Sequence, residues 1–394
     1  MAKRNCRPPG LNLDKTLLAE LAALELADLR RHLRTVDESA LLNFAATDYL
    51  GLSRHPALIE AARRATSERG TGAGASRIVT GTDSAVLALE EQLAAWKEKE
   101  AALVFSSGYA AALGTIPALV DKGDTVILDK LAHASLIDAA RLSGATLRVF
   151  PHNQLQKLDA LLQKISTTRG AGRTLIVTES IFSMDGDTAP LRELVELKDR
   201  HGAWLLVDEA HATALYGTTG AGLISEAGLS SRVEIVMGTL SKALGSVGGY
   251  IAGSRPLIDW LVNRARSFVY STALPPGVIA ASRVAVDLAR GPEGAALRAR
   301  LRENIARFHA GLPAAWKKQA LSASAIQPLI CGEAAAALSL AVALRERGFL
   351  IPAIRYPTVP RHAARLRVTL SAAHASKEID ALNEELASIY SSRS

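Results

Sequence analysis

Short β-rich apolar runs alternate with helical stretches between about residues 100 and 255. The stretches between the runs repeat their apolar residues with helical spacing, as in Ser135–Ser143, Leu155–Ile165 and Leu191–Arg200. This alternation predicts an α/β fold with a mostly parallel sheet of seven strands, covered by helices on both faces. The expected strands are Ala102–Phe105, Thr125–Leu128, Thr146–Phe150, Thr174–Thr178, Trp204–Val207, Glu234–Met237 and Gly249–Ala252.

Polar residues follow several of these expected strands. Asp208 comes directly after Val207, Ser183 lies just beyond the run that ends at Thr178, and Lys242 follows the run that ends at Met237. In open parallel sheets, ligands bind beyond the carboxyl ends of the strands. We therefore expect these side chains to share one site.

The residues around Lys242 indicate the chemistry of that site. Lys242 follows hydroxyl residues at Thr239 and Ser241, about one βαβ unit after a strand that ends in Asp208-Glu-Ala-His211. A Schiff base with pyridoxal phosphate (PLP) needs an amine, an acid for the pyridine nitrogen and hydroxyls for the phosphate. The pattern predicts a PLP site.

A turn of small residues, Ser106-Ser107-Gly108-Tyr109, leads from an expected strand into an expected helix. Such a helix start offers unpaired amides to a phosphate, although it is also an ordinary connection. The hydroxyls at Thr239 and Ser241 favour the phosphate site.

His133 and the pair Arg365 and Arg367 each allow two interpretations. His133 opens a helix and could be a polar cap, or it could stack on a flat aromatic ring. The two arginines alternate along an expected strand and share a face. They could form a solvated edge or clamp a carboxylate, and the residues alone leave this open.

The chain continues past the alternating region through a proline pair at 275–276. A helical stretch from about 277 to 311, a mixed region over 323–374 and a helix at 376–391 predict a smaller α+β domain. The amino-terminal residues, helical over 14–34, are expected to complete it. The expected division is 1–47 for the N-terminal helical segment, 48–276 for the large PLP-binding domain and 277–394 for the small domain.

Bulk properties limit the class of protein. The longest apolar run, Ala334–Leu344, is shorter than the roughly 18 residues of a membrane span. The first ten residues have no hydrophobic segment behind their charges, so no secretory signal is expected. Cys6 and Cys331 have no metal-ligand spacing. These features predict a cytoplasmic protein without metal or membrane association.

The formal net charge of +7 is spread along the chain rather than gathered in a basic run with aromatic residues. Nucleic-acid binding is therefore not expected, and anionic substrates account for the excess of positive charge.

In combination, these residues resemble the α-oxoamine synthases, PLP enzymes of the aspartate-aminotransferase fold (fold type I). The resemblance runs from about Asn43 to His374. It rests on Thr71-Gly-Ala-Gly-Ala-Ser-Arg-Ile-Val-Thr-Gly81, His133-Ala-Ser, Ser183-Met-Asp-Gly-Asp187, Val207-Asp-Glu-Ala-His211, Thr239-Leu-Ser-Lys242 and Tyr270-Ser-Thr272, which occur in the family's order.

The resemblance implies roles for cofactor-binding residues. Lys242 would carry PLP as a Schiff base, Asp208 would pair with the pyridine nitrogen, His211 would bind the ring hydroxyl and His133 would stack on the ring. The other residues implied to contact the cofactor are Ser183, Gly108, Tyr109, Thr239, Ser241 and, from the other subunit of a homodimer, Thr272. Lys242, His133, Asp208 and His211 form the implied catalytic set.

For substrates, the resemblance implies that Arg367 binds an amino-acid carboxylate and that Arg30 and Thr358 contact an acyl thioester. Thr47 stands where the family has an asparagine that helps to hold the carboxylate. The segment Ala353–Pro360, with Arg355, favours members that condense L-alanine with a pimeloyl thioester in biotin synthesis. The acyl carrier would be coenzyme A or acyl carrier protein.

Two alternatives remain at this stage. Another member of the same family would condense glycine with succinyl-CoA or acetyl-CoA, or serine with a long acyl chain. A protein of a different class would use the fold to sense ligands without catalysis, although the intact Lys242, Asp208 and His211 argue against it.

Overall fold

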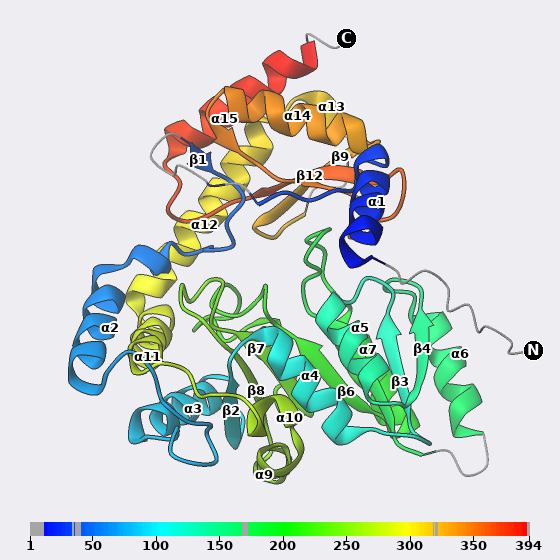
Figure 1. The fold of residues 1–394 in the computed structure, drawn as a ribbon, viewed down its shortest axis with the longest axis vertical. Helices are drawn as coiled ribbons and strands as arrows, with labels where there is room; N and C mark the ends of the chain where they lie inside the picture. The colour runs from blue at the N-terminus through cyan, green and yellow to red at the C-terminus, as the bar shows by residue number, and fades with distance from the viewer. Residues whose placement is uncertain are drawn as a thin grey trace, which may run out of the picture.

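The computed structural model describes residues 12–33, 35, 41–167, 172–317, 319 and 322–391. Figure 1 shows two bodies, a large one around the central sheet and a smaller one above it. The expectations for the first ten residues and for Cys6 lie outside the described residues. Among the described helices, none is long and apolar enough to cross a membrane.

The large body contains a seven-stranded sheet with the order β2-β8-β7-β6-β5-β3-β4. All neighbours pair in parallel except those of β8, which runs antiparallel to β2 and β7. The expected mostly parallel sheet is confirmed. Its strands are β2 (Ala101–Phe105), β3 (Thr125–Asp129), β4 (Thr146–Phe150), β5 (Thr174–Glu179), β6 (Trp204–Asp208), β7 (Ile235–Thr239) and β8 (Gly249–Gly253).

Helices cover both faces of this sheet because successive strand side chains point to opposite sides. Leu103 packs in one apolar cluster while its neighbour Val104 packs in the other. The Leu103 side is covered by α4 (Gly108–Leu119), α5 (Ala134–Leu142), α9 (Arg255–Arg264) and α10 (Arg266–Val269). The Val104 side is covered by α3 (Ser84–Trp96), α6 (Leu155–Ser166) and α7 (Leu191–His201).

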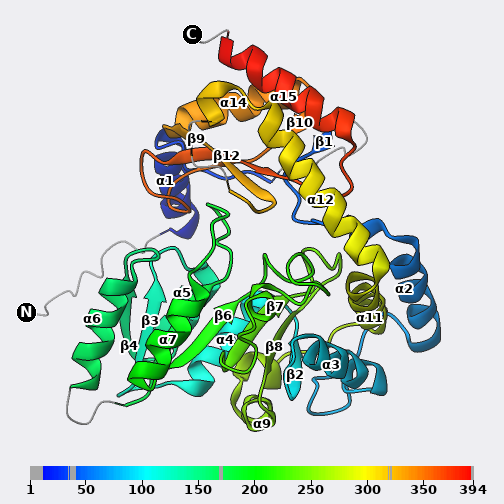
Figure 2. The ribbon, with the colours of Figure 1, turned by 180° about the vertical axis from the view of Figure 1, so that it is seen from behind.

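The smaller body is built around a three-stranded antiparallel sheet with the order β11-β12-β9 (Figure 2). An early segment of the chain joins this body, because β1 (Leu42–Asn43) pairs in parallel with β10 (Phe349–Leu350). Its other elements are β9 (Ile326–Gly332), β11 (Ala353–Ile354), β12 (Ala364–Thr369), α12 (Pro292–Gly311), α13 (Ala314–Lys317), α14 (Ala334–Glu346) and α15 (Ser376–Ser391).

Two expected helices differ in extent. The helix expected over 14–34 is α1 (Leu13–Leu26), and it ends early because Asp28 adopts φ 55°, outside the helical region. The stretch expected over 277–311 is two helices, α11 (Pro276–Arg290) and α12. Pro292 has no N–H to donate and disfavours helical geometry at Gly291, whose ψ is −176°. The remaining elements are η1 (Leu52–Arg54), α2 (Pro56–Arg69) and α8 (Leu223–Glu226).

Candidate active site

Five strand ends meet at one edge of the central sheet, facing the smaller body (Figure 1). The loops after β2, β3, β5, β6 and β7 carry the residues singled out from the sequence. This arrangement follows from the parallel order, since the carboxyl ends of parallel strands lie side by side.

Lys242, His211 and Tyr49 form a hydrogen-bonded chain at this edge. Lys242 Nζ lies 3.1 Å from His211 Nε2, and the Tyr49 hydroxyl lies 2.6 Å from His211 Nδ1. Gly245 tightens the loop after Lys242: it has φ +62°, and a Cβ there would meet the backbone of Leu52 and Ser53. The loop therefore needs glycine at this point to bring Lys242 against His211.

Burial sets the protonation of this chain. Loss of water around the Lys242 amine lowers its pKa, despite the nearby carboxylates of Asp208 and Glu179. Burial also lowers the pKa of His211 well below its usual value, and the charges of Lys242 and Arg367 add to that effect. Burial therefore shifts both groups toward their neutral forms.

The hydrogen bonds then assign the tautomer of His211. Burial raises the pKa of Tyr49 to about 12, so its hydroxyl stays protonated and donates a hydrogen bond to His211 Nδ1. The ring proton of His211 therefore lies on Nε2 and points at Lys242 Nζ. The charge of Arg367 acts on the Tyr49 hydroxyl and lowers its pKa, which links Arg367 to Lys242 through two side chains.

Asp208 and Glu179 place two carboxyl groups side by side, because these residues are partners in the register of β6 and β5. They are 5% and 2% exposed. Burial raises the pKa of Asp208 and raises that of Glu179 well above its usual value. Glu179 Oε1 has no hydrogen-bond partner within the described part of the chain. A buried acid pair with an unmet oxygen suits a cationic ring nitrogen, as in protonated PLP.

The loops after β2 and β7 form a polar cradle a short distance away. Thr239 Oγ1 lies 2.6 Å from Ser241 Oγ, and a Cβ built on Gly108 would lie 3.9 Å from Thr239 Oγ1. Ser107 caps the start of α4 by accepting from the amide of Ala110 at 3.0 Å. Amides at a helix start beside two hydroxyls suit a phosphate. The chain's residues thus fit both ends of PLP.

The turn that carries His211 is held by a buried ion pair. Lys97 Nζ lies 3.0 Å from Glu209 Oε2, and Glu209 Oε1 accepts from the amide of Ile224 at 2.9 Å. Both charged side chains are almost fully buried. The pair fixes Glu209 between Asp208 and His211, so those two side chains keep their directions.

Arg367 and Arg365 are both buried, at 6% and 4% exposure, so the solvated edge is excluded. Arg367 Nε donates to the Ser183 carbonyl at 2.7 Å, and its Nη1 donates to Thr369 Oγ1 at 3.1 Å. Arg365 Nη1 donates to Asp185 Oδ1 at 2.5 Å. The loop after β5 is therefore tied to β12 of the smaller body.

His133 is the cap of α5, because its Nδ1 accepts from the amide of Ser135 at 3.2 Å. Its ring is exposed at the strand edge, and partial loss of water lowers its pKa. The cap and the expected stacking are compatible, since the cap uses a nitrogen in the ring plane and stacking uses the ring face. Tyr109 donates from its hydroxyl to Asp138 Oδ2 at 2.8 Å.

The expected acyl contacts lie together, between the segment after α1 and the smaller body. Arg355 Nε donates to the Asp28 carbonyl at 2.5 Å, and its Nη2 donates to the Arg30 carbonyl at 3.0 Å. Arg31 reaches Thr358 Oγ1 at 3.4 Å. A cavity of about 600 Å³ beside them is also lined by Arg345. In this structure Arg355 uses its donors to hold the segment after α1.

Thr272 lines a different cavity, and Thr47 lies beside Tyr49. Thr272 pairs with Ser76 in an isolated bridge and lines a cavity of about 170 Å³ with Arg77 and Ser106. Thr47 is half-buried, and its carbonyl accepts from the amide of Tyr49 at 2.9 Å.

The sequence analysis missed Tyr49 and Glu179. Tyr49 stands two positions after Thr47 in a polar-aromatic segment, which was a usable signal. Glu179 was left outside the expected strand that ended at Thr178, although β5 runs to Glu179.

Comparisons with known proteins agree with this arrangement. A model of the family described as aminotransferase class I and II matches residues 39–386. The 8-amino-7-oxononanoate synthase of Geobacter metallireducens is 47% identical over 377 residues, covering 93% of this chain and 96% of that protein.

Solved structures give a similar result. Serine palmitoyltransferase from S. paucimobilis with bound PLP has a TM-score of 0.87 at 28% identity, covering 96% of this chain and 98% of that one. An 8-amino-7-oxononanoate synthase from Francisella tularensis has a TM-score of 0.76 at 28% identity, covering 91% and 100%.

Proposed function

The chain belongs to the class I and II aminotransferase family as a PLP-dependent α-oxoamine synthase, and we propose that it catalyses the 8-amino-7-oxononanoate synthase reaction. In this acyl transfer, L-alanine condenses with a pimeloyl thioester, and 8-amino-7-oxononanoate, CO₂ and a free thiol are released. The observation that carries the proposal is the Lys242 amine, whose pKa is lowered by burial, held by His211 in the site that also contains buried Arg367.

The cofactor would be held by the two groups of residues described above. Asp208 and Glu179 suit the ring nitrogen, while Thr239, Ser241 and the start of α4 at Gly108 suit the phosphate. PLP supplies an electron sink that stabilises negative charge at the α-carbon of the bound amino acid.

The chain's own residues would bind, orient and move protons. Arg367 would bind the amino-acid carboxylate through the guanidinium donors that Ser183 and Thr369 leave available, since hydrogen bonds between guanidinium and carboxylate are charge-assisted. Burial lowers the pKa of Lys242, which favours its amine as the general base that accepts the α-proton. The His211 Nε2 proton, kept there by Tyr49, would hold Lys242 Nζ in position.

The acyl carrier would reach the site beside the segment after α1. Coenzyme A and acyl carrier protein both carry a phosphate at the far end of the pantetheine arm that bears the acyl thioester. The cavity of about 600 Å³ lined by Arg30, Arg31, Arg345 and Arg355 offers the matching positive charge. This charge supports a phosphate-bearing thioester as the donor.

A matrix of thiol-release assays tests the reaction. L-alanine, glycine and L-serine are each combined with pimeloyl, succinyl, acetyl and palmitoyl thioesters, carried by coenzyme A or by acyl carrier protein. L-alanine with a pimeloyl thioester should give the largest kcat/KM. A larger value for another pair would replace the proposed substrates, and a Lys242→Ala variant should be inactive with every pair.

The proposal extends to a two-fold dimer with shared sites. The helix α1 buries none of its side chains within the chain, and Leu13, Leu18 and Leu26 are 69%, 67% and 91% exposed. Thr272 lines a surface cavity rather than the group around Lys242, which suits a role toward a partner's phosphate. Mixing Lys242→Ala with Thr272→Trp should restore activity, because a hybrid dimer has one intact site. An active monomer in sedimentation would contradict this part.

A further inference from the structure

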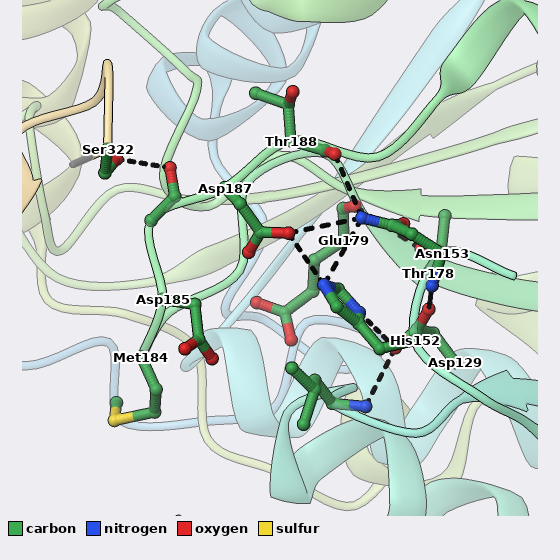
Figure 3. Close-up of polar contacts among 12 residues, drawn as sticks. Asp129, His152, Asn153, Thr178, Glu179, Met184, Asp185, Asp187, Thr188 and Ser322 are labelled. Carbon is green, nitrogen blue, oxygen red and sulfur yellow. Dashed lines mark hydrogen bonds and ion pairs between the residues drawn. The ribbon is translucent and has the colours of Figure 1, made fainter. Parts of the chain in front are cut away.

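His152 lies just beyond β4, between two carboxylates from different loops (Figure 3). Its Nδ1 lies 2.9 Å from Asp129 Oδ1, and its Nε2 lies 2.7 Å from Asp187 Oδ2. Asn153 joins the same two residues, since its amide donates to Asp129 Oδ2 at 3.0 Å and its side chain donates to Asp187 Oδ2 at 3.2 Å. The dipeptide therefore bridges the two loops twice.

The positive charge of His152 strengthens its hydrogen bonds to the two carboxylates. Burial lowers the pKa of His152, but the hydrogen bonds and charges of Asp129 and Asp187 outweigh that effect and raise the pKa to about 10. The ring is therefore an imidazolium that donates from both nitrogens. It also packs edge-on against Phe182, with centroids 4.3 Å apart and planes at 88°.

Each carboxylate anchors a loop of the candidate active site. Asp129, at the end of β3, accepts from the amide of Leu131 at 2.8 Å and so shapes the turn that leads to His133. Asp187 closes the loop after β5, where its carbonyl accepts from the amide of Phe182 at 3.0 Å. A change at His152 would reach both loops.

The loop that ends at Asp187 also supports the arginines of β12. The Ser183 carbonyl accepts from Arg367, and the Met184 carbonyl and Asp185 carboxylate accept from Arg365. On its far side, the Gly186 carbonyl accepts from Ser322 Oγ at 2.6 Å. The loop thus holds Arg367 in position, and His152 holds the loop against the large body.

We propose that His152 is a positioning residue for amino-acid binding: by bridging Asp129 and Asp187, it fixes the Ser183 carbonyl that aims Arg367 at the substrate carboxylate. This role rests on the proposed function, because it takes Arg367 as the carboxylate anchor. His152 itself would touch neither substrate nor cofactor.

The test compares His152→Gln with a matched control, His201→Gln, in the PLP-loaded enzyme. His201 Nε2 lies 2.7 Å from Asp159 Oδ1 in the same body, on the helix pair α6 and α7 rather than on a site loop. Both variants lose a histidine–carboxylate pair. His152→Gln should raise the dissociation constant for the amino acid by about tenfold in calorimetric titration, which is the loss of one charge-assisted hydrogen bond. His201→Gln should leave it unchanged.

Kinetics separates positioning from general damage. His152→Gln should raise the amino-acid KM in parallel with the dissociation constant and leave the acyl-thioester KM unchanged. Asp187→Asn probes the same link from the other side and serves if His152→Gln fails to fold. The double variant should be no worse than the more affected single variant, because both changes break one bridge.

The outcomes separate this proposal from the proposed function. Titrations with L-alanine, glycine and L-serine measure amino-acid affinity whichever thioester is used. If only glycine or L-serine binds the wild-type enzyme, the proposed substrate is wrong. The effect of His152→Gln is then measured on the affinity for the amino acid that does bind. If the variants lower the melting temperature as His201→Gln does but leave amino-acid affinity unchanged, His152 is only structural and the proposal is overturned. Additive effects in the double variant would also overturn it.

Discussion

The hydroxyl of Tyr49 lies 2.6 Å from Nδ1 of His211, and both side chains are buried. Because the charge of Arg367 acts on Tyr49, and His211 contacts Lys242, the pair connects the expected carboxylate anchor to the expected base. The tautomer of His211, and with it the direction of the proton facing Lys242, depends on one phenol.

Tyr49→Phe should therefore change how the enzyme responds to acid. Without the phenol, Nδ1 keeps a free lone pair, so protonation of His211 becomes easier and its pKa rises toward the usual value. The acidic limb of the kcat–pH profile should move to higher pH, and kcat at neutral pH should fall about tenfold.

Tyr250→Phe is the matched control, since Tyr250 is buried in β8 and its hydroxyl lies 2.9 Å from Thr213 Oγ1. It should cost stability and leave the acidic limb where it is. Equal profiles for Tyr49→Phe and the wild type would show that Tyr49 does not control His211.

Asp208→Asn should keep the fold and lose most of the activity. Burial raises the pKa of Asp208, so its carboxylate needs a facing cation such as the ring nitrogen of the cofactor. A neutral amide cannot hold that proton in place, and preorganised charges of this kind are typically worth at least about 10²-fold in rate. Thiol release at saturating substrate gives the rate, while circular dichroism and cofactor absorbance check the fold and loading. A rate within about threefold of wild type would be a far smaller loss than expected. It would show that Asp208 does not hold the proton of the ring nitrogen.

The sheet and the residues that directly follow its strands could be predicted because their signals are local. Alternating β-rich and helical stretches predict a mostly parallel sheet. Asp208, Thr239 and Lys242 stand within a few positions of a strand end. Tyr49 had no strand-end signal: it lies in a polar-aromatic segment and meets His211 across 162 positions, a contact that local spacing does not predict.

His152 and Glu179 were missed for a different reason. Each stands at or just after a strand end, like the residues that were identified. Nothing in the sequence shows that the Glu179 carboxylate is left without a partner, or that His152 lies between two carboxylates from distant positions. The roles of Arg30, Arg355 and Thr358 remain predictions. Their neighbours depend on how the segment after α1 folds back, which helical spacing does not determine.

The stability of the protein should depend on pH through His152. Its pKa is about 10 in the folded chain and about 6.5 when unfolded, so its contribution is complete below pH 6.5. As pH rises from 6.5 to 10, the unfolded state has lost the proton that the folded state still holds. The free energy of unfolding should then fall with a slope of up to about 1.4 kcal/mol per pH unit.

Denaturant titrations of the wild type and His152→Gln between pH 6.5 and 9.5 measure this difference in slope. The variant should be less stable at pH 6.5, and its curve should approach the wild type as pH rises. Parallel curves would mean that His152 is not protonated between Asp129 and Asp187.

Thr47 should limit amino-acid affinity. It is half-buried, and its carbonyl accepts from the amide of Tyr49, the residue that contacts Arg367. An asparagine there would bring an amide donor toward a carboxylate held by Arg367, and hydrogen bonds to charged groups contribute about 1.5–3 kcal/mol. Because the threonine hydroxyl supplies part of this hydrogen-bond energy, Thr47→Asn should lower the amino-acid KM by about three- to tenfold.

The KM of the acyl thioester should stay the same, and Arg367→Ala should raise the amino-acid KM steeply in either background. A higher KM for L-alanine in Thr47→Asn would mean that Thr47 suits another amino acid, and glycine and L-serine titrated against the same variant would identify it.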